Sequence, residues 1–267
     1  MSTALRQALA DELQQAHRTR QPVAPLTARH PGLTLDDAYA IQLLQVAALT
    51  AAGGRVVGHK VGLTSQAMQE LLGVHEPDYG HLLEEMVHAD PGTGAVLDPA
   101  RFLQPRVEPE IGFILGRRLA GPGVTIEQAA DAVAYAVPAL EIVDSRIADW
   151  RIGLLDTIAD NASSGAVVLG PDWLPIDGLD LAAVSCAMTC NGQDAGAGTG
   201  AAVMGSPLTV LAWLANTLGP RGVTLEPGHV VIPGALCAMI PVTAGDVVTA
   251  AFTSLGSVTA RFEADHA

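Results

Sequence analysis

The sequence predicts a mixed α+β fold, and three observations lead to this prediction. Two helical patterns with clear start and stop signals occupy the first 54 residues. From Arg55 onward, short apolar runs are separated by Gly, Pro and Asp, which is typical of strands. These strands outnumber the helices and do not alternate with them, which argues against a doubly wound α/β fold. We therefore expect a helical N-terminal lobe at residues 1–54 and a strand-rich domain at residues 55–267.

The helices are predicted from caps and apolar spacing. Ser2 or Thr3 can cap a first helix, in which leucines recur every four residues. After a proline-containing stretch at 22–31, a second helix begins at Thr34 as N-cap and ends at Gly53-Gly54. Further helical patterns are predicted at 65–72, with Ser65 as N-cap, at 125–135 and at 208–218.

The strands are predicted from apolar runs and turn residues. The predicted strands are 55–61, 106–115, 137–143, 165–169, 183–190, 229–233, 246–253 and 257–263. Asn191-Gly192 is a strong hairpin signal. The following stretch, 192–205, is rich in Gly and Ala but lacks the G-x-G-x-x-G spacing of a dinucleotide site. We expect it to be a loop.

Composition excludes several classes of partner. The net charge of −14 argues against nucleic acid and against anionic membrane surfaces. Three cysteines without ligand spacing suit a reduced compartment, and neither a signal peptide nor an apolar run of about 18 residues is evident. We expect a cytoplasmic protein. Its low charged fraction of 16% and high hydrophobic fraction of 49% favour a homo-oligomer.

Lys60 is the only lysine in the chain, against thirteen arginines, and it lies in the largely apolar run 56–63. Arginine replaces lysine readily on a solvated surface, but not where a compact ammonium with an adjustable pKa is needed. A composition bias that left this lysine by chance is the alternative. We expect Lys60 to act in acid–base chemistry, with a pKa lowered by burial near a bound cation.

Three glutamates predict a metal site. Glu108 and Glu110 are two residues apart, so both carboxylates point to the same face of one strand. Glu141 lies in a second apolar strand. Carboxylates without nearby His or Cys ligands indicate a hard cation, Mg²⁺ or Mn²⁺. The alternative is that Glu108 and Glu110 face solvent on a half-buried strand. Asp78 follows Pro77, so it could equally be a turn residue.

Several runs together resemble the hydratase and decarboxylase branch of the fumarylacetoacetate hydrolase superfamily. The matching runs are Gly58-His59-Lys60-Val61-Gly62-Leu63-Thr64-Ser65, Pro77-Asp78-Tyr79-Gly80, Glu108-Pro109-Glu110, Pro138-Ala139-Leu140-Glu141-Ile142-Val143-Asp144-Ser145-Arg146, Asp160-Asn161-Ala162-Ser163-Ser164-Gly165, Trp213-Leu214-Ala215-Asn216, Gly245-Asp246 and Leu255-Gly256-Ser257-Val258. The family usually has Ala between the two glutamates where this chain has Pro109. Proline removes a strand N–H, which affects the local geometry. The resemblance implies a mixed-strand β-roll with a small helical N-terminal region.

The resemblance also implies an activity and its residues. Its nearest members are hydratases of 2-hydroxypenta-2,4-dienoate in aromatic meta-cleavage pathways. It places Mg²⁺ or Mn²⁺ on the three glutamates, where the metal polarises the substrate's 2-oxygen and stabilises an enolate. It implies that Lys60 and Asp78 transfer protons and activate water, while Leu63, Asn161 and Ser163 bind substrate. The expected partners are the small 2-hydroxy-dienoate or 2-oxo acid and a pathway decarboxylase or aldolase.

Two alternatives stay open at this point. A 4-oxalocrotonate decarboxylase would share the metal site, the lysine and the enolate chemistry. Asp78 favours the hydratase, because water addition needs an extra base and loss of CO₂ does not. The second alternative is a non-catalytic subunit that stabilises a hydratase or decarboxylase partner. The complete set of acids with the lone lysine argues against it.

Overall fold

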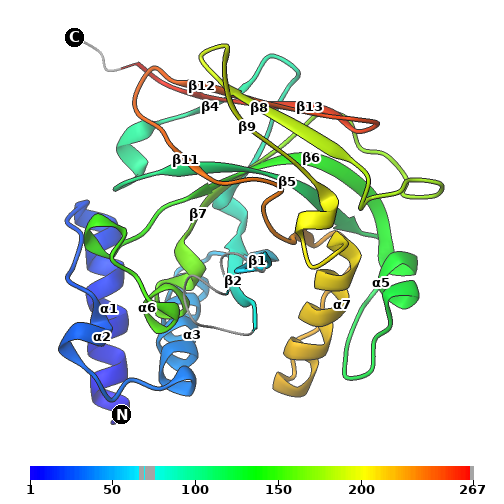
Figure 1. Ribbon diagram of the computed structural model, residues 1–267. Coiled ribbons are helices and arrows are strands. Elements are labelled where there is room, and N and C mark those ends of the chain that lie inside the picture. Colours follow the sequence, from blue (N-terminus) through cyan, green and yellow to red (C-terminus); the bar gives the residue numbers. More distant parts are fainter. Residues whose placement is uncertain (66–68, 70–75, 265–267) are drawn as a thin grey trace.

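The computed structural model describes residues 1–65, 69 and 76–264 and consists of two mixed β-sheets with helices packed beside them (Figure 1). The larger sheet has the strand order β2-β1-β10-β5-β6-β7-β3, with β11 pairing with β5. The smaller has the order β4-β13-β12-β8-β9. Parallel pairs such as β1 with β10 occur among antiparallel ones. The predicted mixed α+β class is therefore confirmed.

The strands have the following bounds. In the larger sheet they are β1 (Val56–Gly62), β2 (Asp78–Leu83), β3 (Val87–Ala89), β5 (Arg106–Leu115), β6 (Val133–Val143), β7 (Ser164–Leu169), β10 (Val230–Ile232) and β11 (Ile240–Pro241). In the smaller sheet they are β4 (Ala95–Leu97), β8 (Ser185–Cys190), β9 (Gln193–Thr199), β12 (Val247–Phe252) and β13 (Gly256–Phe262). The two sheets enclose one large apolar core built from Val, Leu, Ile and Ala, as the low aromatic content requires.

The larger sheet curls strongly. β10 and β5 separate β1 from β6. In a flat sheet with about 4.8 Å between neighbours, β1 and β6 would lie roughly 14 Å apart. Side chains from these two strands nevertheless meet at 3.3 Å, between Lys60 and Glu141. The edge strand β2 also contacts β7 and the turn that precedes it. Strand curvature therefore brings distant parts of the chain to one place.

In the described part of the chain, the α-helices are α1 (Thr3–Thr19), α2 (Leu26–Arg29), α3 (Leu35–Ala51), α5 (Ile126–Ala132), α6 (Leu154–Ala159) and α7 (Pro207–Leu218). Ser2 caps α1 and Thr34 caps α3, as the sequence predicts. Thr34 also forms a capping box with Asp37. α1 and α3 share a small apolar core with Ile147 and with Ile158 of α6. The helical layer thus includes a segment from beyond residue 54, and the domain division at that residue stays a prediction.

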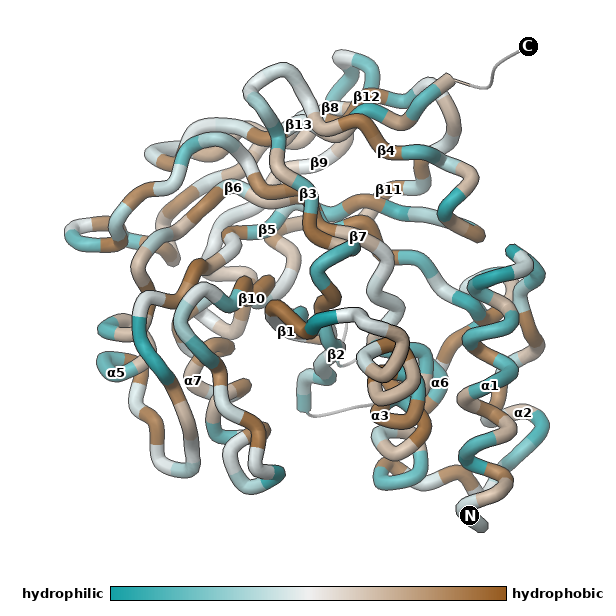
Figure 2. Tube along the Cα trace, turned by 180° about the vertical axis from the view of Figure 1, so that it is seen from behind, coloured by the Kyte–Doolittle hydropathy of each residue, from teal (hydrophilic) through white to brown (hydrophobic). Residues whose placement is uncertain are grey.

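Hydropathy follows this arrangement. In Figure 2, α1 alternates between hydrophobic and hydrophilic residues. One stretch, Gly200–Arg221, is long and apolar enough to cross a membrane by length and composition alone. Within it, α7 buries Val210, Leu211 and Leu214 in the main core, as a core helix of a globular protein does.

Two predicted elements are wrong in part. Residues 193–199 form the strand β9 and not a loop, because the Asn191-Gly192 turn folds them back onto β8. The helix predicted at 125–135 ends at Ala132, and its last residues belong to β6. Strands β2, β3, β4 and β11 were not predicted. The helix predicted at 65–72 falls largely outside the described residues.

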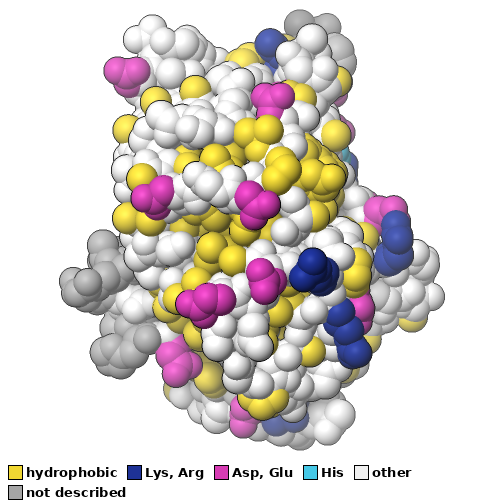
Figure 3. All heavy atoms as spheres, turned by 90° about the vertical axis from the view of Figure 1, so that its right-hand side faces the viewer, with side chains coloured by type: hydrophobic (Ala, Val, Ile, Leu, Met, Phe, Trp, Pro, Cys, Tyr) yellow, Lys and Arg dark blue, Asp and Glu magenta, His cyan; other side chains and the backbone are white. Residues whose placement is uncertain are grey.

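One face of the molecule carries an apolar band. Figure 3 shows hydrophobic side chains gathered across the middle of this face, with acidic side chains scattered over it. Over the whole described surface, the large hydrophobic side chains that are more than a third exposed are Leu35, Leu43, Leu49, Val96, Ile126, Tyr135, Trp173 and Met204. The rings of Tyr135 and Trp173 lie 6.1 Å apart. An apolar surface of this kind is typical of a protein that associates.

Candidate active site

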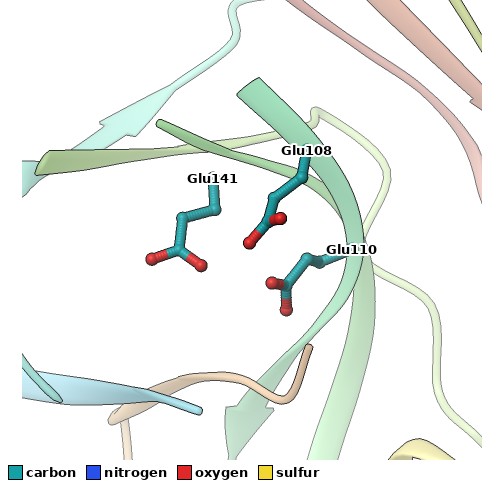
Figure 4. A group of neighbouring side chains, drawn as sticks. All are labelled: Glu108, Glu110 and Glu141. Carbon is teal, nitrogen blue, oxygen red and sulfur yellow. The ribbon is translucent and has the colours of Figure 1, made fainter. Parts of the chain in front are cut away.

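Three glutamates converge on one face of the larger sheet. Glu108 on β5 lies directly opposite Glu141 on β6, and Glu110 follows two residues along β5 on the same face. Each offers a carboxylate oxygen within 4.8 Å of the other two. Figure 4 shows the three carboxylates turned toward one another from these two strands. Strand register therefore creates the cluster that the sequence predicted.

These carboxylates suit a divalent cation. Burial and the neighbouring charge of Glu141 raise the pKa of Glu108 to about 8, and the same two causes raise the pKa of Glu110 well above its ordinary value. Burial also raises the pKa of Glu141. Among the described residues, Oε1 of Glu110 and both carboxylate oxygens of Glu141 are buried without a hydrogen-bond partner, although Oε1 of Glu141 lies within ion-pair distance of Lys60. Oxygen donors left without partners in this way fit a hard cation such as Mg²⁺ or Mn²⁺.

Lys60 reaches the same place from β1. Its side chain is buried, its Nζ lies 3.3 Å from Oε1 of Glu141, and it donates to the backbone oxygen of Ala162 at 3.1 Å. Burial lowers the pKa of Lys60, but Glu141, Asp78 and the other two glutamates outweigh it and raise that pKa overall. Without a cation, the charge of the carboxylates thus exceeds the effect of burial. The lowered pKa was expected for Lys60 near a bound cation, and it stays a prediction.

Asp78 lies beside Lys60 at the start of β2. Its pairing partner on β1 is Gly62, and a Cβ at Gly62 would lie 2.3 Å from Oδ1 of Asp78 and 3.5 Å from Nζ of Lys60. Position 62 must therefore be glycine to leave room for the Asp78 carboxylate and the Lys60 ammonium. Burial raises the pKa of Asp78 although Lys60 lowers it, and its buried Oδ2 has no hydrogen-bond partner among the described residues. Asp78 is thus part of the site and not an exposed turn residue.

Two of the predicted substrate-binding residues, Asn161 and Ser163, lie in the turn before β7. Asn161 and Ser163 lie on either side of Ala162, whose carbonyl accepts from Lys60. The Asn161 amide exchanges two hydrogen bonds with the backbone of His81, at 2.8 and 2.9 Å, and the Ser163 hydroxyl lies 3.3 Å from that of Thr157. Their predicted contacts with substrate stay predictions.

Leu63 lies just beyond the end of β1 with a left-handed φ of 58°. Its backbone oxygen accepts from the Gln69 side chain at 2.8 Å. Leu63 lies three residues after Lys60 in the chain. Its predicted role in binding substrate also stays a prediction.

Two groups at the site were missed from the sequence, and both belong to the main chain. They are the Ala162 carbonyl and the N–H of Gly234, which donates to Oε2 of Glu110 at 2.5 Å. Main-chain groups leave no residue-type signal. The nearest signal is Gly234 itself, which follows β10 and has a φ of 128° that favours glycine.

Comparison with known proteins assigns the family. Residues 56–263, which include the lysine, the aspartate and all three glutamates, match the model of the fumarylacetoacetate (FAA) hydrolase C-terminal domain. The chain belongs to the fumarylacetoacetate hydrolase family. The predicted resemblance is therefore confirmed, and the roll-shaped mixed sheet described above is the fold of this family.

Characterised members of the family align over nearly the whole chain. A 2-hydroxyhexa-2,4-dienoate hydratase of Comamonas testosteroni is 44% identical over 94% of each chain. A 2-keto-4-pentenoate hydratase of Paraburkholderia xenovorans is also 44% identical, over 99% of this chain and 97% of its own. The solved structure of 4-oxalocrotonate decarboxylase from Pseudomonas putida G7, complexed with magnesium and adipate, superposes with a TM-score of 0.94 at 34% identity, covering 98% of both chains.

Proposed function

We propose that this protein is a hydro-lyase that adds water to 2-hydroxypenta-2,4-dienoate, or to a close 2-hydroxy-dienoate. The product is 4-hydroxy-2-oxopentanoate or its homologue. The observation that carries the proposal is the convergence of Lys60 and Asp78 beside the three-glutamate cluster. The 44% identity to enzymes named as hydratases of such dienoates supports it.

Glu108, Glu110 and Glu141 would hold Mg²⁺ or Mn²⁺. When bound there, the ion supplies Lewis-acid polarisation of the substrate's 2-oxygen and neutralises the three clustered carboxylates. The related decarboxylase, whose structure contains magnesium, supports a divalent cation.

Lys60 and Asp78 would carry the proton transfers. The reaction needs a proton at the far carbon of the dienol while the 2-hydroxyl loses one, which gives an α,β-unsaturated 2-oxo acid. A base then takes a proton from the water that adds at C4, and C3 receives a proton. Nζ of Lys60 is buried 3.3 Å from Oε1 of Glu141, so it would donate a proton to a substrate held at the glutamates. The unpaired Oδ2 of Asp78 can accept a proton from water. Leu63, Asn161 and Ser163 would contact the substrate or the water.

The activity is tested by following loss of the dienol absorbance when purified protein is supplied with 2-hydroxypenta-2,4-dienoate and Mg²⁺ or Mn²⁺. Accumulation of 4-hydroxy-2-oxopentanoate supports the proposal. Parallel assays with the hexadienoate homologue show which chain length the enzyme prefers. An unchanged absorbance with both substrates contradicts the proposed activity.

4-Oxalocrotonate decarboxylation is the second candidate, because the decarboxylase structure superposes over nearly the whole chain. Two observations favour hydration. Identity to the hydratases is higher, at 44% against 34%. In addition, Asp78 offers a buried carboxylate next to Lys60, and loss of CO₂ does not require such a base. Release of CO₂ from 4-oxalocrotonate without hydration of the dienoate would decide for the decarboxylase.

We also propose that the protein is a cytoplasmic homo-oligomer that acts in the meta-cleavage degradation of aromatic compounds, alongside a pathway decarboxylase or aldolase. The apolar band of Figure 3 supports self-association. Light scattering coupled to size-exclusion chromatography measures the oligomeric state. A purely stabilising, non-catalytic subunit is disfavoured, since such a subunit would not need Lys60, Asp78 and three clustered glutamates in one site.

A further inference from the structure

The turn that contacts Lys60 is held in an unfavourable backbone conformation. Asn161, Ala162 and Ser163 have φ values of 53°, 51° and 53°, so three successive non-glycine residues are left-handed. Each such residue is disfavoured by contact between its Cβ and the backbone. Such strain persists only where the surroundings enforce it, and it tends to accumulate at functional sites.

A buried arginine enforces the conformation from outside the site. Arg146 is 6% exposed, and its guanidinium bonds to groups at both ends of the turn. On one side, Nε donates to Oδ1 of Asp160 at 2.5 Å, and the NH2 group donates to the Asp160 carbonyl. On the other side, the NH1 group donates to the Ser164 carbonyl at 2.8 Å. The NH1 group also donates to the Asp144 carbonyl at 2.5 Å, which fixes the guanidinium to the end of β6.

The turn at 161–163 packs directly against β1 and β2, the strands that carry Lys60 and Asp78. Gly80, the pairing partner of Lys60, would place a Cβ 2.4 Å from the Asn161 carbonyl oxygen. The Asn161 side chain bonds to the backbone of the next residue, His81. A shift of the turn would therefore move the Ala162 carbonyl away from Nζ of Lys60 and would loosen β2 near Asp78.

We propose that Arg146 is a positioning residue: by clamping Asp160 and Ser164 it holds the turn 161–163 left-handed, and the Ala162 carbonyl then fixes the Lys60 ammonium beside Glu141. This inference rests on the proposed function only in taking Lys60 as the group that transfers a proton. Arginine is required because its planar fork bonds to several acceptors at once, whereas a lysine ammonium is a compact point charge.

Arg146→Lys tests the proposal while keeping the buried charge. We expect kcat to fall about tenfold to a hundredfold, because small displacements of a catalytic group have effects of that size. KM and Mg²⁺ affinity should change by less than about twofold, since the glutamates are not displaced. Hydrogen exchange should become faster in peptides covering 157–165. Arg118→Lys, at an exposed ion pair with Glu226, is the matched control.

A rescue experiment separates positioning from general stability. Glycine adopts a positive φ without the Cβ penalty, so adding Ala162→Gly to Arg146→Lys should recover at least severalfold of the lost kcat. Wild-type kcat in Arg146→Lys would overturn the proposal. So would a loss that follows the folded fraction alone and is not recovered by Ala162→Gly.

If Arg146→Lys does not fold, Asp160→Asn provides the second variant, with the same expected loss of kcat and the same local change in exchange. The wild-type protein gives a measurement that needs neither variant nor substrate. Hydrogen exchange at amides of the turn should be as slow as at those of β7. Exchange at the rate of an exposed loop would overturn the proposed role of Arg146. Absence of dienoate turnover by the wild type would contradict the proposed function and leave this exchange test standing.

Discussion

The backbone N–H of Gly234 donates to Oε2 of Glu110 at 2.5 Å, so the loop after β10 orients one of the three carboxylates. The other oxygen of Glu110 has no partner among the described residues and is left for a cation. Gly234 tolerates no side chain here, because a Cβ would lie 1.9 Å from the Thr64 hydroxyl. The loop, the end of β1 and the metal cluster are thus fixed relative to one another.

Gly234→Ala should therefore damage the metal site. We expect a loss of roughly 2–4 kcal/mol in the free energy of unfolding and a Mg²⁺ affinity lower by about tenfold or more, measured by chemical denaturation and calorimetric titration. Gly178→Ala is the control, because Gly178 has a φ of 77° but no atom within 4 Å of its Cβ position. That variant should be destabilised only by about 1–2 kcal/mol, with cation affinity unchanged. Equal cation affinities in the two variants would contradict the orienting role.

Lys60→Arg keeps the positive charge in the site but replaces a compact ammonium by a larger group that does not deprotonate. We expect the variant to fold, to bind Mg²⁺ with near wild-type affinity and to lose activity by about 10²- to 10⁴-fold. The reverse exchange Arg118→Lys, at an exposed position, should have no effect on kcat. Full activity in Lys60→Arg would show that this lysine has no catalytic role and that composition bias alone explains its presence.

Asp78→Asn preserves the size of the side chain and removes its ability to accept a proton. Hydration should slow by about 10²- to 10⁴-fold, measured by dienol consumption, with Mg²⁺ affinity changed by less than about threefold. Asp131→Asn, on the exposed side of α5, serves as the control and should behave as wild type. If Asp78→Asn hydrates the dienoate at the wild-type rate, another group activates the water.

The metal should stabilise the protein more at higher pH. Without a cation, the pKa of Glu108 is raised from its ordinary 4.5 to about 8. The folded state therefore binds more protons than the unfolded state between these values. The stability contributed by this protonation is complete below about pH 4.5 and is lost as the pH rises through about 8. A bound cation replaces these protons.

We expect the rise in Tm on adding Mg²⁺ to be larger at about pH 8 than at about pH 5.5, by at least roughly 2–4 °C. Differential scanning calorimetry with and without a chelator measures it. In Glu108→Gln, the rise in Tm on adding Mg²⁺ should depend less on pH, and turnover should fall. The exposed Glu85→Gln should retain both the wild-type pH dependence and wild-type turnover. A Mg²⁺ effect that is independent of pH would contradict the buried-carboxylate explanation.

The sequence by itself determined the elements whose signals are local. The Thr34 N-cap, the strand of Glu108 and Glu110 and the strand of Glu141 depend on nearby residue types and on spacing. They therefore formed as predicted. Strand β9 was missed, because its Gly- and Ala-rich residues have little strand preference of their own and are ordered by pairing with β8. Strand β2 was missed because Pro77-Asp78 also suits a turn.

Only the tertiary structure decided how these pieces form a site. Curvature of the larger sheet brings Lys60 on β1 within 3.3 Å of Glu141 on β6, across two intervening strands. Long-range packing also brings in the main-chain groups of Ala162 and Gly234. Residue types and spacing encode which chemical groups the chain possesses. Their distances, and the direction in which the pKa of Lys60 moves, depend on charges and backbone atoms that are remote in sequence and meet only in the folded protein.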